Sequence, residues 1–295
     1  MSSLRIATFL PQIRMSFAEI EEKVSAAESL GYDSVWLMDH LAAPGMPQSD
    51  CLEAWTLASA LAVRTERIRL GHLVLCNEFR HPALLAKMAA SLDQISGGRF
   101  ELGLGWGSVP DELVAFGFGN APARVRAGRL KETLEVLKRL FTGEEVCYEG
   151  DYFSLDGAVA NPRPLQDPLP IHLGGAGPKL TRHLVRRYAT WWNCPSYGID
   201  KLAELRPLVG GARVSAQHPI GLVRSESERA SVEQLTKRRF GSWGGLIVGN
   251  AEEVAAALSR EVALGVEMFV LQFHDFGDPA SLEAFARDVA PQLSA

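Results

Sequence analysis

A histidine that directly follows an aspartate is the clearest candidate for chemistry in this chain. Asp39 and His40 come immediately after a β-prone run, Ser34 to Met38. Histidine titrates near neutral pH and is the most frequent general acid or base, and a neighbouring carboxylate can orient its ring. We therefore interpret Asp39 and His40 as a candidate general acid pair, and a structural histidine that closes the strand is the alternative.

Glycine gathers at two other places where a predicted strand ends. Gly103, Gly105 and Gly107 close one strand, where missing side chains indicate either close approach of a flat ligand or a tight turn. A second run, Gly174-Gly175-Ala176-Gly177, precedes a helix predicted from Pro178. Free N–H groups at a helix start suit a phosphate, and a simple strand-to-helix turn is the alternative.

The stretch from Ile68 to Gly107 predicts the elements that position these residues. An apolar β-prone run is followed by a helix that begins at Pro82, where a proline costs no hydrogen bond. Apolar residues recur every three or four positions as far as Ile95, and Ser96-Gly97-Gly98 ends the helix before the next strand. This pattern is typical of a βαβ unit in a parallel sheet.

The same alternation continues along the whole chain. Eight strands are expected, at Arg5–Phe9, Ser34–Met38, Ile68–Cys76, Phe100–Gly105, Ile171–Leu173, Ala189–Asn193, Pro219–Val223 and Met268–Phe273. The main helices are expected at Phe17–Leu30, Cys51–Arg64, Pro82–Ile95, Arg124–Phe141, from Pro178, and at Ile199–Val209, Ser225–Arg239, Asn250–Leu264 and Pro279–Leu293. Eight units predict an α/β fold, a (β/α)8 TIM barrel, with a doubly wound sheet as the alternative.

One segment interrupts the alternation between units four and five. Residues 146–154 indicate a β-hairpin, and a proline-rich loop follows from Asn161 to Pro168. We interpret it as a small insertion in a single domain that covers residues 1–295. Residues 41–50, 108–122 and 241–245 are expected to be loops or irregular.

In a barrel the carboxyl ends of the strands meet at one mouth. The residues expected there are Asp39, His40, Cys76, Asn77, Gly105, Trp106, Gly107, Ser108, Gly174, Gly175, Ala176, Gly177, Trp192, Asn193, His274 and Asp275. This set is apolar, aromatic and rich in glycine, which favours a planar ring over a metal or a sugar. One of Trp191 and Trp192 is expected to face the mouth.

Composition excludes several classes of partner. A net charge of −5 argues against nucleic acid, and four widely spaced cysteines without a CxxC pair indicate neither zinc nor a disulfide framework. The histidines have no metal-like spacing, and no metal is expected. No signal peptide and no membrane-spanning apolar run are present in the sequence, so a cytoplasmic protein without membrane contact is expected.

Three long runs resemble the bacterial luciferase-like monooxygenase family, and its coenzyme F420-dependent oxidoreductases most of all. These runs are GYDSVWLMDHL, RIRLGHLVLCNEFRHPALLAKMAASLDQISGGRFELGLGWG and PIHLGGAGPKLTRHLVRRYATWWN, and the closing VLQFHDFGDPASLEAFA is also similar. The resemblance implies a barrel with a deazaflavin or flavin at its mouth. It further implies a bulge on the third strand, with a non-prolyl cis peptide at Leu73–Val74 behind the ring.

The resemblance also implies roles for individual residues. Asp39, Cys76, Asn77, Gly105 and Gly107 would line the ring and its side chain, while Gly175, Ala176 and Gly177 would hold the phosphate. His40 would donate a proton or anchor the substrate. Leu73, Val74, Trp106, Ser108, Gly174 and Trp192 complete the expected cofactor site.

The activity implied is hydride transfer between coenzyme F420 and a small organic substrate. Two alternatives remain open, an FMN-dependent two-component monooxygenase that needs a flavin reductase, and a non-catalytic flavin-binding barrel. A homodimer formed by the helices after strands two and three is expected. Ser108 stands where related alcohol- or sugar-oxidising members often carry a glutamate, and nearby Glu112 is interpreted as a possible surface residue.

Overall fold

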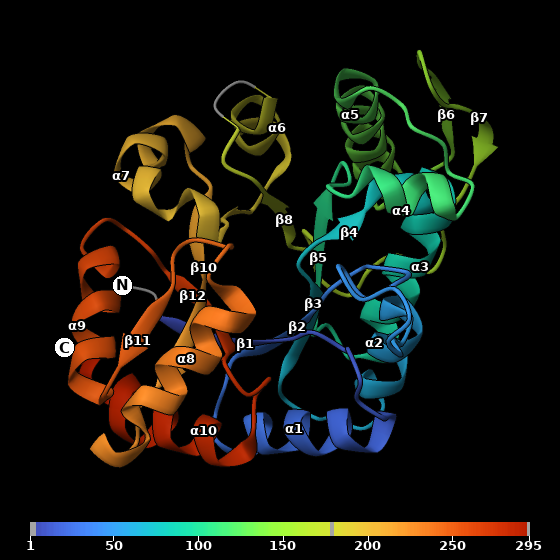
Figure 1. Cartoon of the computed structure of the whole chain (residues 1–295). Coiled ribbons are helices and arrows are strands. Elements are labelled where there is room, and N and C mark those ends of the chain that lie inside the picture. The colour runs from blue at the N-terminus through green and yellow to red at the C-terminus, as the bar shows by residue number, and fades with distance from the viewer. Residues whose placement is uncertain (1–3, 178–179, 294–295) are drawn as a thin grey trace.

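The computed structural model describes residues 4–177 and 180–293. Within these residues ten parallel strands form one sheet. Of these, β4 continues β3, and the short β11 pairs with β10. The remaining eight close into a barrel in the order β12-β1-β2-β3-β5-β8-β9-β10, and β10 pairs with both β9 and β12 (Figure 1). The predicted (β/α)8 barrel is therefore confirmed. Its strands are β1 (Arg5–Leu10), β2 (Ser34–Leu37), β3 (Arg69–His72), β4 (Leu75–Cys76), β5 (Phe100–Gly105), β8 (Ile171–Gly174), β9 (Trp191–Cys194), β10 (Arg213–Leu222), β11 (Ile247–Gly249) and β12 (Met268–Phe273).

Helices surround the strands, and the larger hydrophobic core lies between the two layers (Figure 1). Their starts follow local sequence signals: Ser16 and Glu19 form a capping box on α1, Pro82 occupies the first turn of α3, and Asn250 with Glu253 caps α9. The helices are α1 (Phe17–Ser29), α2 (Ala54–Ala62), α3 (Pro82–Ile95), α4 (Pro110–Ala115), α5 (Ala123–Leu140), α6 (Leu180–Tyr188), α7 (Leu202–Leu205), α8 (Arg229–Phe240), α9 (Ala251–Val262) and α10 (Pro279–Ala284). The start predicted at Pro178 lies outside the described residues.

The predicted hairpin insertion is present beside α5 (Figure 1). Its strands, β6 (Val146–Glu149) and β7 (Ser154–Ala158), pair antiparallel. The Glu132 carboxylate of α5 accepts hydrogen bonds from the backbone N–H groups of Asp151, Tyr152 and Phe153, at 2.8, 3.0 and 3.0 Å. A side chain of the barrel's own helix therefore fixes the hairpin turn.

Four elements differ from the sequence prediction. β10 extends the strand core predicted at Pro219–Val223 back to Arg213, and this first half carries polar residues such as Ser215, whose hydroxyl accepts a hydrogen bond from Asn193 on the adjacent β9 at 3.0 Å. α4 lies in a region that was expected to be irregular, and β11 was not predicted as a strand; both elements are short. Residues 199–209 contain only the four-residue α7, flanked by 3₁₀ turns.

Charged and aromatic side chains close the amino end of the barrel. Glu101 accepts hydrogen bonds from Arg5, at 2.7 Å, and from Arg69, and its other oxygen lies 2.7 Å from His172 Nε2. Burial raises the pKa of Glu101, but His172 and the two arginines hold it well below its usual range. The His172 ring stacks on Trp191, so this end is filled by an ion-paired carboxylate and stacked rings.

The third strand contains one extra residue, as the resemblance implied. Gly71 pairs with Glu101 and Leu75 with Leu104, so four steps along this strand match three along β5. The peptide bond between Leu73 and Val74, within the bulge, is cis as predicted. The barrel mouth next to β5 is therefore shaped by a register shift and not by a regular strand end.

Glycines of the neighbouring strands make room for this bulge. A β-carbon at Gly103 would lie 1.9 Å from the His72 carbonyl oxygen, and one at Gly105 would lie 2.7 Å from Val74 Cγ2. One at Gly174 would contact Val74 Cγ1 at 3.5 Å. Val74 thus lies against the ends of both β5 and β8, and neither Gly103 nor Gly105 can accept a side chain without displacing the bulge.

We predict that Gly103→Ala lowers the free energy of unfolding by about 3 kcal/mol or more, because the methyl group overlaps backbone that cannot move independently. Gly211→Ala is the matched control, since a β-carbon there meets no atom within 4 Å and the change should stay within about 1 kcal/mol. Urea denaturation measures both variants. Equal effects would show that the bulge does not constrain Gly103.

His72 predicts a pH dependence of stability. Its buried Nε2 lies 3.2 Å from the Ala54 carbonyl oxygen, its ring stacks on Trp55, and burial lowers its pKa to about 4. Between pH 6.5 and 4 this histidine is protonated in the unfolded chain but stays neutral in the folded protein. It should therefore lower the free energy of unfolding by about 3 kcal/mol as the pH falls through this range. His72→Phe should flatten that part of the urea-denaturation profile, whereas the exposed His183→Asn should not. Parallel profiles for all three proteins would contradict the assignment.

Candidate functional site

Asp39 is a structural clamp at the carboxyl end of β2. Its side chain is 1% exposed and forms a bidentate ion pair with Arg80. Arg80 Nη1 donates to Asp39 Oδ2 at 2.6 Å, and Arg80 Nη2 donates to Asp39 Oδ1 at 2.9 Å. The backbone N–H of Cys76 donates to the same carboxylate at 2.7 Å. Asp39 therefore ties the end of β2 to the segment immediately after the bulge.

His40 pairs with Glu112 and not with Asp39. His40 Nδ1 lies 2.9 Å from Glu112 Oε2, and the two side chains are 23% and 9% exposed. The other oxygen of Glu112 accepts the backbone N–H groups of Leu41 and Ala42, at 2.7 and 3.2 Å. One carboxylate thus fixes both the imidazole and the backbone that follows it.

Two sequence predictions about this pair are wrong. Asp39 does not orient the imidazole, because its oxygens are engaged by Arg80 and Cys76. Glu112 is not a surface residue: α4 carries it to His40 across a separation of 72 residues. The local sequence around Glu112 indicates only the start of a helix, because Pro110 is followed by the acidic residues Asp111 and Glu112. Arg80, the partner of Asp39, was missed entirely.

The glycines at the end of β5 are required by packing within the chain itself. A β-carbon at Gly105 would meet Val74, and one at Gly107 would lie 3.0 Å from Cys76 Sγ, so contact between the chain's own segments explains both. Burial raises the pKa of the Cys76 thiol to about 12, which keeps it protonated and unreactive. Trp106 packs partly against the core, and Ser108 is exposed.

The turn after β8 is partly committed to internal bonds. The Gly175 N–H donates to the Asn193 carbonyl oxygen at 3.2 Å. Gly175 has a φ of 135°, a conformation that favours glycine. The prediction that the Gly175 N–H is free for a phosphate is therefore wrong, since its role is to make the turn.

Neither tryptophan of β9 faces the mouth. Trp192 is 1% exposed in the core between strands and helices, and its indole N–H donates to the Gly175 carbonyl at 2.9 Å. Trp191 points into the barrel at its amino end, where it stacks on His172. The interpretation of Trp192 as a ring contact is wrong, because it supports the glycine turn from behind.

Unpaired polar groups remain near the mouth. Asn77, 3% exposed, has no hydrogen-bond partner among the described residues for either its amide nitrogen or its oxygen. Gln272 Oε1 is likewise buried and unpaired within the described chain, and strand alternation places Gln272 on the interior side with Met268 and Val270. Such groups are costly unless a ligand or water bonds them.

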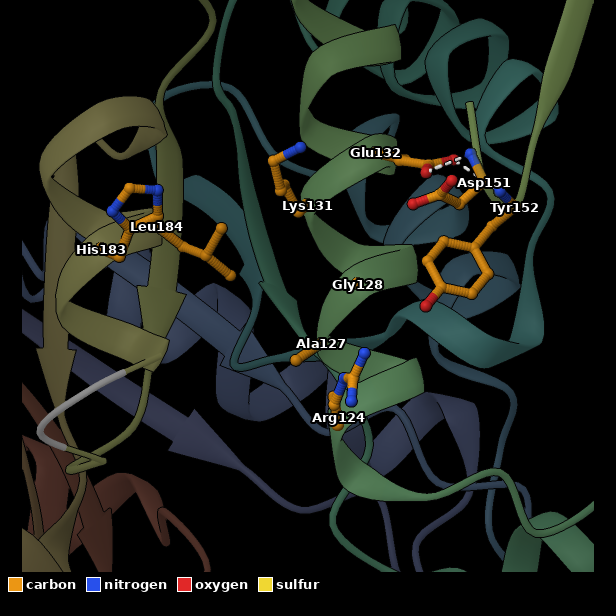
Figure 2. A pocket seen from close by; sticks show the side chains of 9 residues that line it. All are labelled: Arg124, Ala127, Gly128, Lys131, Glu132, Asp151, Tyr152, His183 and Leu184. Atoms are coloured by element: carbon orange, nitrogen blue, oxygen red, sulfur yellow. Dashed lines mark hydrogen bonds between the residues drawn. The ribbon is translucent and has the colours of Figure 1, made fainter. Parts of the chain in front are cut away.

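A separate cavity of about 240 Å³ lies between α5, α6 and the hairpin turn. Figure 2 shows Lys131 of α5 and His183 of α6 along its sides, with Glu132 directed at the hairpin. Its charges are mixed, and it contains none of the strand-end residues predicted for the site. The barrel mouth is therefore the better candidate.

Within 4–177 and 180–293, no helix is long and apolar enough to cross a membrane. No group of three or more His, Cys, Asp or Glu side chains in those ranges is placed to hold a metal ion. The mouth instead offers a histidine–glutamate pair, a bulged strand and unpaired amides.

These features define a (β/α)8 barrel protein whose candidate site lies at the carboxyl ends of its strands. Residues 2–224 match the family model described as luciferase-like monooxygenase, and the chain belongs to that family.

Named relatives and one solved structure accompany the family match. An F420-dependent glucose-6-phosphate dehydrogenase of Nakamurella multipartita is 36% identical over 56% of this chain and 48% of that protein. The chain thus spans about half the length of that relative. A similarly named protein of Kineococcus radiotolerans is 29% identical over 90% of each chain. An F420-dependent secondary alcohol dehydrogenase, solved with an F420–acetone adduct, superposes over 100% of both chains with a TM-score of 0.82 at 20% identity, which supports the fold.

Proposed function

We propose that this protein is a coenzyme F420-dependent oxidoreductase that transfers a hydride between the deazaflavin and a small organic substrate. The observation that carries the proposal is the His40–Glu112 pair, which stands beside the bulge at the mouth where Asn77 is left unpaired. The names of the two relatives support the choice of F420. The expected homodimer stays a prediction.

The residues at the mouth fit a flat, polar heterocycle. The Asn77 amide offers an unused donor and an unused acceptor, which match the N–H and C=O groups along the polar edge of a deazaflavin. Leu73 and Val74, held by the glycines and the Asp39 clamp, would support the ring from behind. Near the β8 turn, the backbone N–H groups of Ala176 and Gly177 would hold the phosphate.

His40 is assigned as the general acid or base that exchanges a proton with the substrate. Glu112 accepts the hydrogen on Nδ1 and thereby leaves Nε2 as the nitrogen that can exchange a proton with a substrate oxygen. When bound, the deazaflavin supplies or accepts the hydride, and the protein supplies orientation and the proton. Because Glu112 also bonds two backbone N–H groups, the ring is held at a fixed place relative to the loop after β2.

Cofactor preference is the first measurement. We expect fluorescence quenching to give tight binding of F420 and weak binding of FMN. Asn77→Leu should weaken F420 binding by about tenfold or more, with no loss of stability, because the unpaired amide serves the ligand and not the fold. The reverse preference would indicate an FMN monooxygenase with a flavin reductase partner. Binding of neither cofactor would refute the proposal.

The catalytic pair gives a graded prediction. His40→Ala should leave F420 affinity within a few-fold and reduce turnover by about 10²–10⁴-fold, as expected for loss of a general acid. Glu112→Gln should reduce turnover by about 10–100-fold, since one hydrogen bond to a charged group is weakened. Turnover is followed by F420 absorbance, with isopropanol and glucose 6-phosphate as the first substrates screened.

The control for Glu112→Gln is Asp111→Asn, an exposed neighbour on the same helix, which should retain full turnover. If Glu112→Gln matches this control, Glu112 does not position His40. If His40→Ala retains turnover, the proton comes from another group.

A further inference from the structure

His218 of β10 is buried between two hydrogen-bond acceptors. Its Nδ1 lies 2.7 Å from the Gly245 carbonyl oxygen, and its Nε2 lies 2.8 Å from Glu261 Oε2. The side chain is 1% exposed, so water does not take the place of either partner. A carbonyl oxygen only accepts hydrogen bonds, and a neutral imidazole carries a single N–H. Both contacts are therefore hydrogen bonds only when the His218–Glu261 pair holds a second proton.

Either member of the pair can carry that second proton. On Nε2 it makes an imidazolium beside a carboxylate, and on Glu261 it makes a carboxylic acid that donates to a neutral ring. Glu261 is 13% exposed, so the proton can exchange with solvent there. After it leaves, the ring directs its one hydrogen to the charged carboxylate, which is the stronger acceptor. The Gly245 carbonyl then loses its donor.

The neighbouring groups keep one protonation state at neutral pH and above. Phe269 of β12 is apolar, and its ring centre lies 6.2 Å from that of His218. Cys194 of β9 lies in the field of Glu261, and burial raises the pKa of its thiol to about 12. Burial lowers the pKa of His274, at the end of β12, so this second histidine is neutral there. The contact to Gly245 thus depends on the proton of the His218–Glu261 pair.

Gly245 belongs to a loop, residues 241–246, that packs on the segment after β9. Gly245 has a φ of 58°, and a β-carbon on it would lie 2.7 Å from the Ser196 carbonyl oxygen. The Ser196 hydroxyl donates to the Trp243 carbonyl oxygen at 3.1 Å. The two backbones are therefore in direct contact, and His218 ties the loop to the barrel strand beneath it.

The segment after β9 also supports the turn after β8. Residues 196–201 form a 3₁₀ helix, and a β-carbon at Gly198 would lie 2.7 Å from Ala176 Cβ. Ala176 belongs to the turn assigned above to the phosphate. Direct contacts thus lead from the loop 241–246 through the 3₁₀ helix to this turn, and a displacement of the loop removes support from Ala176.

We propose that His218 is a positioning residue and acts as a pH-sensitive latch. With its second proton the His218–Glu261 pair holds residues 241–246 against the 3₁₀ helix, and loss of this proton at higher pH releases the loop. The turn after β8 then loses its support, so cofactor binding weakens as the pH rises. This last step rests on the proposed function, whereas the latch itself rests on the contacts of His218.

The latch is tested in the full-length protein labelled with 5-fluorotryptophan. The Trp243 signal is assigned by its loss in Trp243→Phe and is followed by ¹⁹F NMR from about pH 5 to about pH 9, where histidine titrates. We expect one titration step in the native protein. Glu261→Gln should abolish the step and keep the low-pH signal throughout, because the glutamine N–H donates to Nε2 and leaves the ring hydrogen for Gly245.

Two further variants complete this test. Glu252→Gln removes an exposed carboxylate from the same helix and should titrate as the native protein does. His218→Gln should also lose the step, but with the high-pH signal throughout, since one amide does not reach both partners. A native protein without a step, or a step that survives in Glu261→Gln, would overturn the latch.

F420 affinity tests the link to the turn after β8. Fluorescence quenching gives the Kd of the native protein and of Glu261→Gln at about pH 6 and about pH 8.5, and the ratio of the two cancels the ionisation of the cofactor and of His40. We expect equal affinities at the lower pH, and binding weaker by about fivefold or more in the native protein at the higher pH. An unchanged ratio would overturn the link. Failure of both proteins to bind F420 would refute the proposed function, while the ¹⁹F result stays readable.

Discussion

One extra residue in the third strand is the constraint on which the mouth of this barrel depends. The bulge between Gly71 and Leu75 pushes Val74 against the ends of β5 and β8. Neighbouring strands must then carry glycine, because a β-carbon at Gly103 would overlap the His72 carbonyl. The glycine pattern is thus a consequence of packing within the chain, and the surface that a ring would rest on is built from Leu73 and Val74.

Two buried carboxylates hold this arrangement. Asp39 binds the backbone just after the bulge and is neutralised by Arg80, while Glu112 binds His40 and the backbone after β2. Each carboxylate is saturated by charge-assisted bonds, which lowers the cost of burying it. The adjacent residues therefore differ in role: Asp39 stabilises the fold, and His40 belongs to the candidate site.

The two ends of the barrel differ in how completely their polar groups are paired. At the amino end Glu101 is surrounded by Arg5, Arg69 and His172. At the carboxyl end Asn77, Gln272 and His274 keep unpaired atoms among the described residues. Unpaired buried groups reduce stability unless a ligand or water bonds them, and the two amides at the carboxyl end meet that condition for a ligand site; at the amino end His172 Nδ1 is also without a partner among the described residues.

The sequence by itself determined the barrel and the hairpin insertion, because these follow from local periodicity and turn residues, whereas the position of the bulge was implied by the resemblance to the family. Only the tertiary structure decided which carboxylate meets His40, which way Trp192 points and why Gly105 is a glycine. Glu112 reaches His40 across 72 positions, and the orientation of Trp192 depends on strand register. Contacts between segments that are distant in sequence cannot be predicted from hydrophobic periodicity, because the relative position of the two segments is set only when the whole chain folds.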